Sequence, residues 1–387
     1  MPNTLTSTLK VLQLGMGWLP EQPGNGLDRM YHNLVRSLPA AGIEVRGLVA
    51  GTNRVADDSG GAVHAFASDT APLFSRLTAV RQSVRAVLEE EQVDLVAAHF
   101  ALYAAPILDL LGDRPLVVHF HGPWALESGA EGESGLRTQT KKLLEGLVYR
   151  RATRCIVLSD AFRDVLVREY RVPRHRIARV PGGVDVDRFD TGLSRLEARR
   201  RLNWPVDRPL LLSVRRLAHR MGLESLIDAL GIVREDHPEV LLHIAGLGPL
   251  RAALQRRIED AGLTDHVRLL GFVPDEDLPL AYRAADVSIV PTVTLEGFGL
   301  ITIESLAAGT PVLVTPVGGL PEAVSELSPS LVLQGRSPSS LAAGIHNALS
   351  HPHRLPAPAD CQAYARRRFG WDAIARQTRA VYEAAHS

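Results

Sequence analysis

The sequence predicts an α/β protein with two domains, each built on a doubly wound parallel sheet. Short apolar runs alternate with longer helix-forming segments along most of the chain, and this spacing is typical of parallel strands joined by crossover helices. A length of 387 residues exceeds what one hydrophobic core usually supports, which favours two domains of ordinary size. Both halves show this alternation, without visible sequence similarity between them.

In the first half, we expect strands at 9–15, 45–49, 94–98, 116–120, 154–158 and 177–180, and helices at 27–38, 77–91, 105–111, 136–151 and 161–170. Gly15 and Gly17 lack the third glycine of a dinucleotide-binding fingerprint, and Pro20 and Pro23 follow where its helix would begin. A Rossmann cofactor site is therefore not expected at this turn. The segment 127–135 is rich in Glu, Ser and Gly, which predicts a mobile loop over a ligand site.

The second half repeats the alternation from about residue 209. Its expected strands lie at 210–214, 240–245, 267–270, 287–290 and 311–314, with a helix at 300–308 and two helices at the end of the chain.

Composition and charge exclude several classes of protein. Lys plus Arg and Asp plus Glu both number 43, so nothing favours a nucleic acid or another polyanion as partner. The two cysteines, Cys155 and Cys361, lack metal-ligand or CxxC spacing, which favours a reducing compartment. No apolar run is long enough to span a bilayer, and the N-terminus lacks the pattern of a signal peptide. We therefore expect a cytoplasmic protein.

The chain is organised around residues 296–304. An apolar strand ends at Pro291, glycines follow at 297 and 299, and a helix begins at Leu300. Glycines let backbone amides approach an anion, and a helix N-terminus adds partial positive charge, so this turn predicts a phosphate site. Glu296 and Glu304 bracket the turn. Because carboxylates repel phosphate, we expect them to bind sugar or ribose hydroxyls.

Two further sets of residues lie at ends of expected strands. Arg215 and Arg216 follow the strand at 210–214, where paired guanidiniums suit diphosphate recognition. His99 and His121 follow two strands of the first half, at the sheet edge where ligands usually bind. A lone histidine is more often structural than functional, and surface arginines are common in an Arg-rich chain. From the residues alone, a functional and a purely structural interpretation both remain for each set.

Two acidic residues separated by seven others, around Gly-Phe-Gly, resemble the signature of retaining GT-B glycosyltransferases of the GT4 type, the glycosyltransferase group 1 family. Companion motifs at 246–249, 271–273 and 318–322 match the same family. The alternative is a strand-to-helix turn of another α/β protein, in which the glutamates only solvate the sheet edge. The resemblance covers nearly the whole chain and is strongest after residue 180.

The resemblance implies two facing Rossmann-like domains with a cleft between them. Residues 1–190 would form an N-terminal acceptor-binding domain, and residues 191–370 a C-terminal domain that binds a nucleotide sugar. Residues 371–387 would form a helix that crosses back to the N-terminal domain. Closure of the domains would bring the two halves of the site together.

The resemblance also implies roles for individual residues. Those of the donor diphosphate site would be Gly26, Arg216, Arg220, Gly299, Leu300 and Ile301. Gly26 belongs to an N-terminal glycine loop at 23–26. Glu304 would bind the ribose, and the residues near the nucleobase would be Gly271, Phe272 and Val273. His121 and Glu296 would be catalytic. The place of His99 at a strand end, and not the resemblance, makes it a candidate acceptor-side contact. Met221 stands where the family usually has a lysine, so Arg220 would supply that charge.

The expected function is retaining transfer of a hexose from a nucleoside diphosphate sugar to an alcohol. A UDP-sugar is favoured as donor and GDP-mannose is second; the acceptor is a saccharide, lipid or natural product. No metal or other cofactor is expected, because Asp185-Val186-Asp187 follows Pro-Gly-Gly, as in the segment that joins the domains of the family. A non-catalytic sugar-nucleotide binder and a GT-B phosphorylase or epimerase are the alternatives. Basic residues in the helix at 136–151 imply either a solvated face or weak peripheral contact with anionic lipid.

Overall fold

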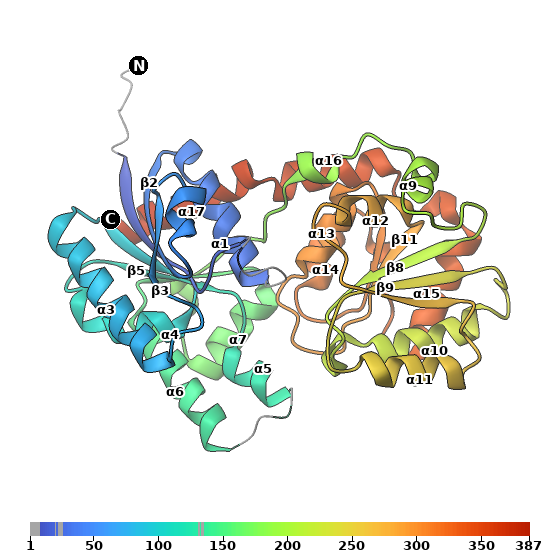
Figure 1. Ribbon diagram of the computed structural model, residues 1–387, viewed down its shortest axis with the longest axis horizontal. Helices are drawn as coiled ribbons and strands as arrows, with labels where there is room; N and C mark the ends of the chain where they lie inside the picture. Colours follow the sequence, from blue (N-terminus) through green and yellow to red (C-terminus); the bar gives the residue numbers. More distant parts are fainter. Residues whose placement is uncertain (1–7, 20, 22–25, 131, 133–134) are drawn as a thin grey trace. The chain divides into compact units, whose positions relative to one another are not determined.

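The computed structural model describes residues 8–19, 21, 26–130, 132 and 135–387. They fold into two compact units, which Figure 1 shows in sequence colours. The first unit comprises Met1–Gly183 and Trp371–Ser387, and the second comprises Val184–Gly370. The chain enters the second unit at Val184, ahead of the boundary expected at 190, and returns to the first unit at Trp371.

The first unit contains a seven-stranded parallel sheet with the order β3-β2-β1-β4-β5-β6-β7. Its strands are β1 Leu9–Leu14, β2 Ile43–Ala50, β3 Val63–Ala67, β4 Leu95–Ala98, β5 Leu116–Phe120, β6 Arg154–Val157 and β7 Ile177–Arg179. Val11 of β1 pairs with Val45 on one side and Leu95 on the other. The chain order reverses between β1 and β4, and ligands of doubly wound sheets usually bind beyond the carboxyl ends of the strands at such a reversal.

Helices cover both faces of this sheet (Figure 1). Side chains alternate along β1: Leu12 packs with Val84 of α3 on one face, and Val11 packs with Leu34 of α1 and Ile374 of α17 on the other. This alternation explains why strand residues on both faces are apolar. The α-helices are α1 Gly26–Ser37, α2 Arg54–Asp58, α3 Leu73–Glu90, α4 Ala101–Ala104, α5 Trp124–Ala130, α6 Leu136–Arg151, α7 Asp160–Tyr170 and α17 Trp371–His386; 3-10 helices span Pro39–Ala41, Ala105–Leu110 and Arg174–Arg176.

The second unit has a five-stranded parallel sheet with the order β10-β9-β8-β11-β12. Its strands are β8 Leu210–Val214, β9 Leu241–Ala245, β10 Val267–Gly271, β11 Val287–Val290 and β12 Val312–Val314. Helix α10 packs against α11 and α15, while α13 packs against α12 and α16. The α-helices are α8 Val186–Phe189, α9 Arg195–Arg201, α10 Leu223–Val233, α11 Arg251–Asp260, α12 Leu278–Ala284, α13 Leu300–Ala307, α14 Leu320–Val324, α15 Pro338–Ser350 and α16 Pro358–Phe369; 3-10 helices span His219–Met221, Pro329–Leu331 and Pro352–Arg354.

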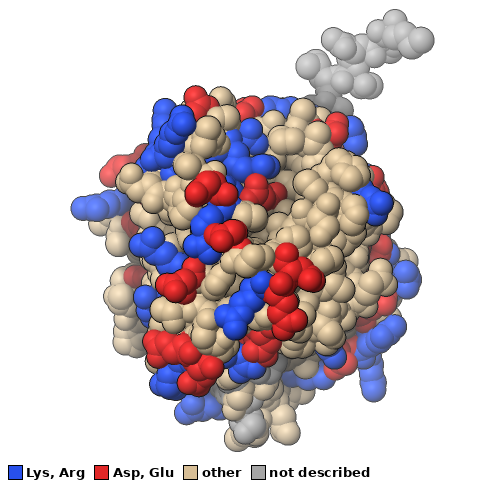
Figure 2. Space-filling view, turned by 90° about the vertical axis from the view of Figure 1, so that its right-hand side faces the viewer, with Lys and Arg blue, Asp and Glu red and all other residues tan. Residues whose placement is uncertain are grey.

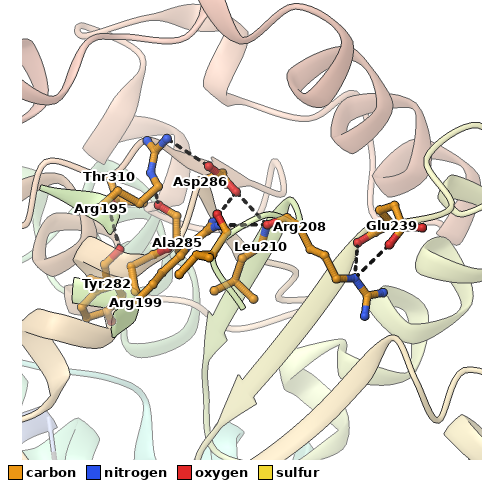
Figure 3. Close-up of polar contacts among 11 residues, drawn as sticks. Arg195, Arg199, Arg208, Leu210, Glu239, Tyr282, Ala285, Asp286 and Thr310 are labelled. Atoms are coloured by element: carbon orange, nitrogen blue, oxygen red, sulfur yellow. Dashed lines mark hydrogen bonds and ion pairs between the residues drawn. The ribbon is translucent and has the colours of Figure 1, made fainter. Parts of the chain in front are cut away.

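Asp286, directly before β11, ties this sheet to helix α9 (Figure 3). Its Oδ2 accepts hydrogen bonds from Arg199 Nη2 and from the amide of Leu210, both at 2.7 Å, and its Oδ1 lies 3.0 Å from Arg195 Nη1. These contacts lie at the amino end of β11, whereas Glu296 follows its carboxyl end. Asp286 therefore fixes the strand that leads to the predicted site.

All the expected strands are present, and the structure adds helices that were not predicted, among them α2, α9 and α11. Three further differences concern the first unit. Residues 127–130, the start of the segment expected as a loop at 127–135, form the end of helix α5. The helix expected at 105–111 is a 3-10 helix, since Pro106 interrupts α-helical hydrogen bonding. Strand β3 was not expected. Figure 2 shows acidic and basic side chains interspersed over the face that it presents.

Candidate active site

The carboxyl ends of β8, β9, β10 and β11 bring most of the predicted residues of the second unit to one sheet edge. Arg215 follows β8, and its amide donates to the carbonyl of Ala245 at the end of β9. Gly246 follows β9, and its amide donates to the carbonyl of Gly271 at 2.7 Å. A Cβ on Gly246 would lie 1.9 Å from the carbonyl oxygen of Arg215. Only glycine therefore permits this close approach of the two strand ends.

Arg215 and Glu296 form a buried ion pair at this edge. Arg215 Nη2 lies 2.6 Å from Glu296 Oε2, and the two side chains are only 7% and 13% exposed. Thr292 joins them, because its Oγ1 lies 2.6 Å from Arg215 Nη2 and 3.2 Å from Glu296 Oε2. The pair keeps Glu296 in a fixed orientation directly before the glycine turn.

The turn between β11 and α13 has the strained backbone often found at functional sites. Leu295 has a φ of 51°, and Gly299, which caps α13, has a φ of 74°. The amide of Gly319 donates to the carbonyl of Glu296 at 3.0 Å, and a Cβ on Gly318 would lie 1.8 Å from that oxygen. Leu300 and Ile301 are the first residues of α13, so their amides belong to its N-terminal turn.

The two arginines predicted to bind diphosphate have different settings. Arg216 is exposed, whereas Arg220 is partly buried and donates from Nη1 to the carbonyl of Leu295 at 3.0 Å. The amide of Val293 in turn donates to the carbonyl of Arg220. Arg220 is therefore attached to the loop that carries Glu296.

Glu304 lies in the second turn of α13 and is buried. Its Oε2 accepts a hydrogen bond from the hydroxyl of Tyr282 at 3.2 Å. Gly271 ends β10 with a φ of 78°, Phe272 is 53% exposed, and Val273 is partly buried. The structure thus places the three predicted nucleobase contacts at the outer strand of the same sheet.

In the first unit, His121 follows β5 and lies next to His99, which follows β4. Nε2 of His121 lies 3.0 Å from Nδ1 of His99. Burial lowers the pKa of His121 to about 4 and holds the pKa of His99 well below its ordinary value. Both imidazoles are therefore neutral at physiological pH.

Gly26 is the first residue of α1. The rest of the glycine loop to which it was assigned, residues 23–25, lies outside the described residues. Asp28, in the first turn of α1, is fully buried and accepts a hydrogen bond from the amide of Gly17 at 2.9 Å. This contact ties the start of α1 to the loop after β1.

The carboxylates of the Asp-x-Asp segment have other partners. Oδ1 of Asp185 caps α8 by accepting from the amide of Arg188, and Asp187 forms an ion pair of 2.8 Å with Arg366. Among the described residues, no group of three or more His, Cys, Asp and Glu side chains is arranged to hold a metal ion.

Helix α6 exposes Leu136, Leu143 and Leu147. Two of its basic side chains have partners within the unit. Lys141 lies over the ring of Trp124, and Lys142 pairs with Glu169 at 2.7 Å. Contact with anionic lipid stays a prediction. Within the described chain, no helix combines the length and apolar character needed to cross a bilayer.

The comparisons with known proteins identify the family. The model of the glycosyl transferases group 1 family matches residues 194–368, and the Glycosyltransferase Family 4 model matches residues 24–188. The D-inositol 3-phosphate glycosyltransferase of Streptomyces scabiei is 32% identical over 307 residues, which cover 76% of this chain and 68% of that protein. The chain belongs to the group 1 glycosyltransferases.

Two further comparisons extend this result. The D-inositol 3-phosphate glycosyltransferase of Streptomyces avermitilis is 31% identical over 305 residues, 76% of this chain and 65% of the relative, so the match spans just under two thirds of that protein. The structure of Anabaena Alr3699/HepE in complex with UDP has a TM-score of 0.77 at 22% identity and covers 97% of this chain and 100% of its own. This likeness confirms the GT-B fold class.

Three residues that form hydrogen bonds around the predicted site were given no individual role from the sequence. Arg215 was seen as one of two arginines at a strand end, yet only Arg216 was assigned a role. In a strand, side chains point alternately to opposite faces, and this alternation could have separated the two. Gln13 forms a hydrogen bond with His99, and Tyr382 forms one with His119, although the residues of each pair lie far apart in sequence. No local signal marks such partners.

Proposed function

We propose that this protein is a retaining, metal-independent glycosyltransferase that moves a hexose from a nucleoside diphosphate sugar to an alcohol. The observation that carries the proposal is the buried Arg215–Glu296 pair, fixed beside the N-terminal turn of α13. An oriented carboxylate suits sugar hydroxyls, and free helix amides suit phosphate. Groups suited to the sugar hydroxyls and to the phosphates of a nucleotide sugar thus lie at one sheet edge.

The donor would lie along the carboxyl edge of the second sheet. Glu296 would hold the sugar and Glu304 the ribose hydroxyls. Gly271, Phe272 and Val273 would lie near the nucleobase, where the exposed ring of Phe272 offers a surface for stacking. The glycine loop that ends at Gly26 would approach the diphosphate.

The difficult step is the departure of the nucleoside diphosphate, on which negative charge grows. Arg216, Arg220 and the backbone amides at 299–301 would stabilise that charge electrostatically, in place of a metal ion. The contact of Arg220 with the Leu295 carbonyl holds its guanidinium at the loop of Glu296. This pre-organisation would compensate for Met221, which replaces the lysine usual in the family.

His121 would contact the donor sugar as a neutral hydrogen-bonding group. Because burial lowers its pKa to about 4, it is unsuited to act as a charged acid near pH 7. Retention would follow front-face attack by the acceptor, with the donor phosphate taking the acceptor proton. That mechanism is taken from the resemblance to the family.

A UDP-sugar is the favoured donor, and the UDP complex of the Anabaena structural neighbour supports this choice. GDP-mannose is the second choice. The Streptomyces relatives are named for an inositol phosphate, a cyclic alcohol, which supports a hydroxyl acceptor. The acceptor class would be a saccharide, lipid or natural product.

The test is a binding panel of UDP-, GDP- and ADP-hexoses, measured by thermal shift and calorimetry in EDTA. Saturable binding of one donor is expected, and weakening by Arg216→Ala would place the diphosphate at that residue. Exposed Arg256 on α11 supplies the matched control, Arg256→Ala, which should bind normally. No binding of any donor in EDTA would refute the proposal.

A further inference from the structure

A chain of hydrogen bonds runs through the interior of the first unit from the C-terminal helix to His121. Tyr382 on α17 contacts Gln13 on β1, with 2.9 Å between the hydroxyl and Nε2 of the amide. Oε1 of Gln13 lies 3.0 Å from Nε2 of His99, and Nδ1 of His99 lies 3.0 Å from Nε2 of His121. A side branch joins the Tyr382 hydroxyl to Nε2 of His119 at 2.7 Å.

The chain is shielded from water. Gln13 and Tyr382 are fully buried, and His99 and His119 are 2% and 6% exposed; only His121, at the end of the chain, is partly exposed. Burial keeps the pKa of all three histidines below the ordinary value. Each imidazole therefore has one N–H donor and one acceptor nitrogen.

Because every group in this chain is neutral, the direction of one hydrogen bond fixes the direction of the next. Oε1 of Gln13 only accepts, so Nε2 of His99 donates to it. Nδ1 of His99 is then its acceptor nitrogen, and Nε2 of His121 donates to it. In the other branch, the Gln13 amide donates to Tyr382, whose hydroxyl proton goes to Nε2 of His119.

The orientation of the Gln13 amide thus sets the direction of both branches. A flipped amide would accept from Tyr382 and donate to His99, which would reverse every later bond. The Tyr382 hydroxyl and the His119 imidazole can either donate or accept, so they fit both orientations of the amide. Which tautomer His121 adopts therefore depends on the orientation of the Gln13 amide.

We propose that Tyr382, Gln13 and His99 are positioning residues that hold His121 as the Nε2–H tautomer and leave its Nδ1 as a hydrogen-bond acceptor. This rests on the proposed function, in which His121 contacts the donor sugar. Nδ1 then accepts a hydrogen bond from a sugar hydroxyl. The C-terminal helix acts on the site through this tautomer, without touching substrate.

Tyr382→Phe is the informative change, because it removes a hydroxyl far along the chain from His121. It takes away the group that accepts from the Gln13 amide. The amide then has no partner that fixes its direction, and His121 populates both tautomers. If the two become equally populated, the competent fraction falls to about half, and kcat falls about twofold.

The test is nitrogen NMR of the full-length protein labelled with ¹⁵N-histidine, without substrate, with the His121 signals assigned by His121→Asn. Wild-type His121 is expected to show a protonated Nε2 and an unprotonated Nδ1. Tyr382→Phe should give mixed signals. Tyr103→Phe is the matched control, because Tyr103 is equally buried and its hydroxyl contacts Arg76 instead; it should leave His121 unchanged.

A protonated Nδ1 in the wild-type protein would overturn the proposal, as would an unchanged His121 spectrum in Tyr382→Phe. Should that variant fail to fold, Gln13→Leu disconnects both branches and should give the same mixed signals. These readouts need no turnover. A protein that binds no sugar nucleotide but shows the expected spectra would therefore refute the proposed function and keep the tautomer assignment.

Discussion

Arg215 and Glu296 are 81 residues apart in sequence, yet Nη2 of the arginine lies 2.6 Å from Oε2 of the glutamate. The parallel pairing of β8 with β11 brings the loops after both strands to the same sheet edge. Removing one member of a buried pair leaves an uncompensated charge, which costs roughly 3–5 kcal/mol. Glu296 is thus positioned by the sheet and by Arg215 together, and not by its own loop alone.

Glu296→Gln should abolish transfer while the protein stays folded. The amide keeps one acceptor oxygen for Arg215, but it loses the charge that would orient sugar hydroxyls. We expect transfer to fall by at least about 100-fold, as when an oriented polar group is removed from an active site. The stability loss should be about 3 kcal/mol, the lower end of the cost of leaving Arg215 without a charged partner, because the amide oxygen still accepts a hydrogen bond from it. Steady-state kinetics and urea unfolding measure the two effects. Exposed Glu276 gives the control Glu276→Gln, and a fully active Glu296→Gln variant would remove the role assigned here.

Gly318→Ala should destabilise the second unit by about 2 kcal/mol or more. Its φ of 57° is unfavourable for alanine, and the new Cβ would lie 1.8 Å from the Glu296 carbonyl oxygen, which must move. The control is Gly231→Ala within α10, where a Cβ meets nothing within 4 Å. That change should stabilise the helix by about 0.5–1 kcal/mol. Equal urea midpoints for the two variants would contradict the geometry of the loop.

Stability should fall as the pH is lowered from about 6.5 to about 4. Burial lowers the folded-state pKa of His121 from 6.5 to about 4. In that window the unfolded chain binds more protons, so the free energy of unfolding decreases on acidification. The full shift corresponds to about 3 kcal/mol for this histidine. Urea unfolding at several pH values should show a shallower dependence for His121→Asn than for wild type. Identical slopes would be inconsistent with a neutral, buried imidazole.

Glu145→Gln should destabilise the first unit by about 2–4 kcal/mol. The buried carboxylate accepts from the amides of Trp124 and Ala125 and from the hydroxyls of Tyr149 and Tyr170. The single oxygen of an amide cannot serve all four donors, so buried groups lose their partners. Calorimetric melting measures the effect. Glu169→Gln removes only the surface pair with Lys142 and should cost at most about 1 kcal/mol; an equal loss in both variants would oppose this account.

The order of strands and helices could be predicted because buried parallel strands are continuous apolar runs. β5 and β8 were placed at their observed positions for this reason. Helix α5 was missed, because Ser and Gly have weaker helix propensity than Ala, Leu or Glu. Its start is fixed by Glu145, which accepts from its first two amides. That contact comes from tertiary packing and leaves no local pattern.

The positions of the candidate site residues relative to the strands could also be predicted. Glu296, Gly299 and His121 all follow strand ends, as expected. The partners that orient them could not be, because Arg215 reaches Glu296 and Tyr382 reaches His119 only through tertiary contacts. Whether each residue binds donor as assigned stays a prediction.

The most direct measurement is release of nucleoside diphosphate by the purified protein in EDTA, with UDP-glucose, GDP-mannose and ADP-glucose tested separately. The proposed function predicts slow, saturable release from one donor, most readily UDP-glucose, which an alcohol acceptor accelerates and Glu296→Gln abolishes. A rate indistinguishable from the protein-free reaction for every donor, at high protein concentration and with acceptor alcohols present, would contradict it.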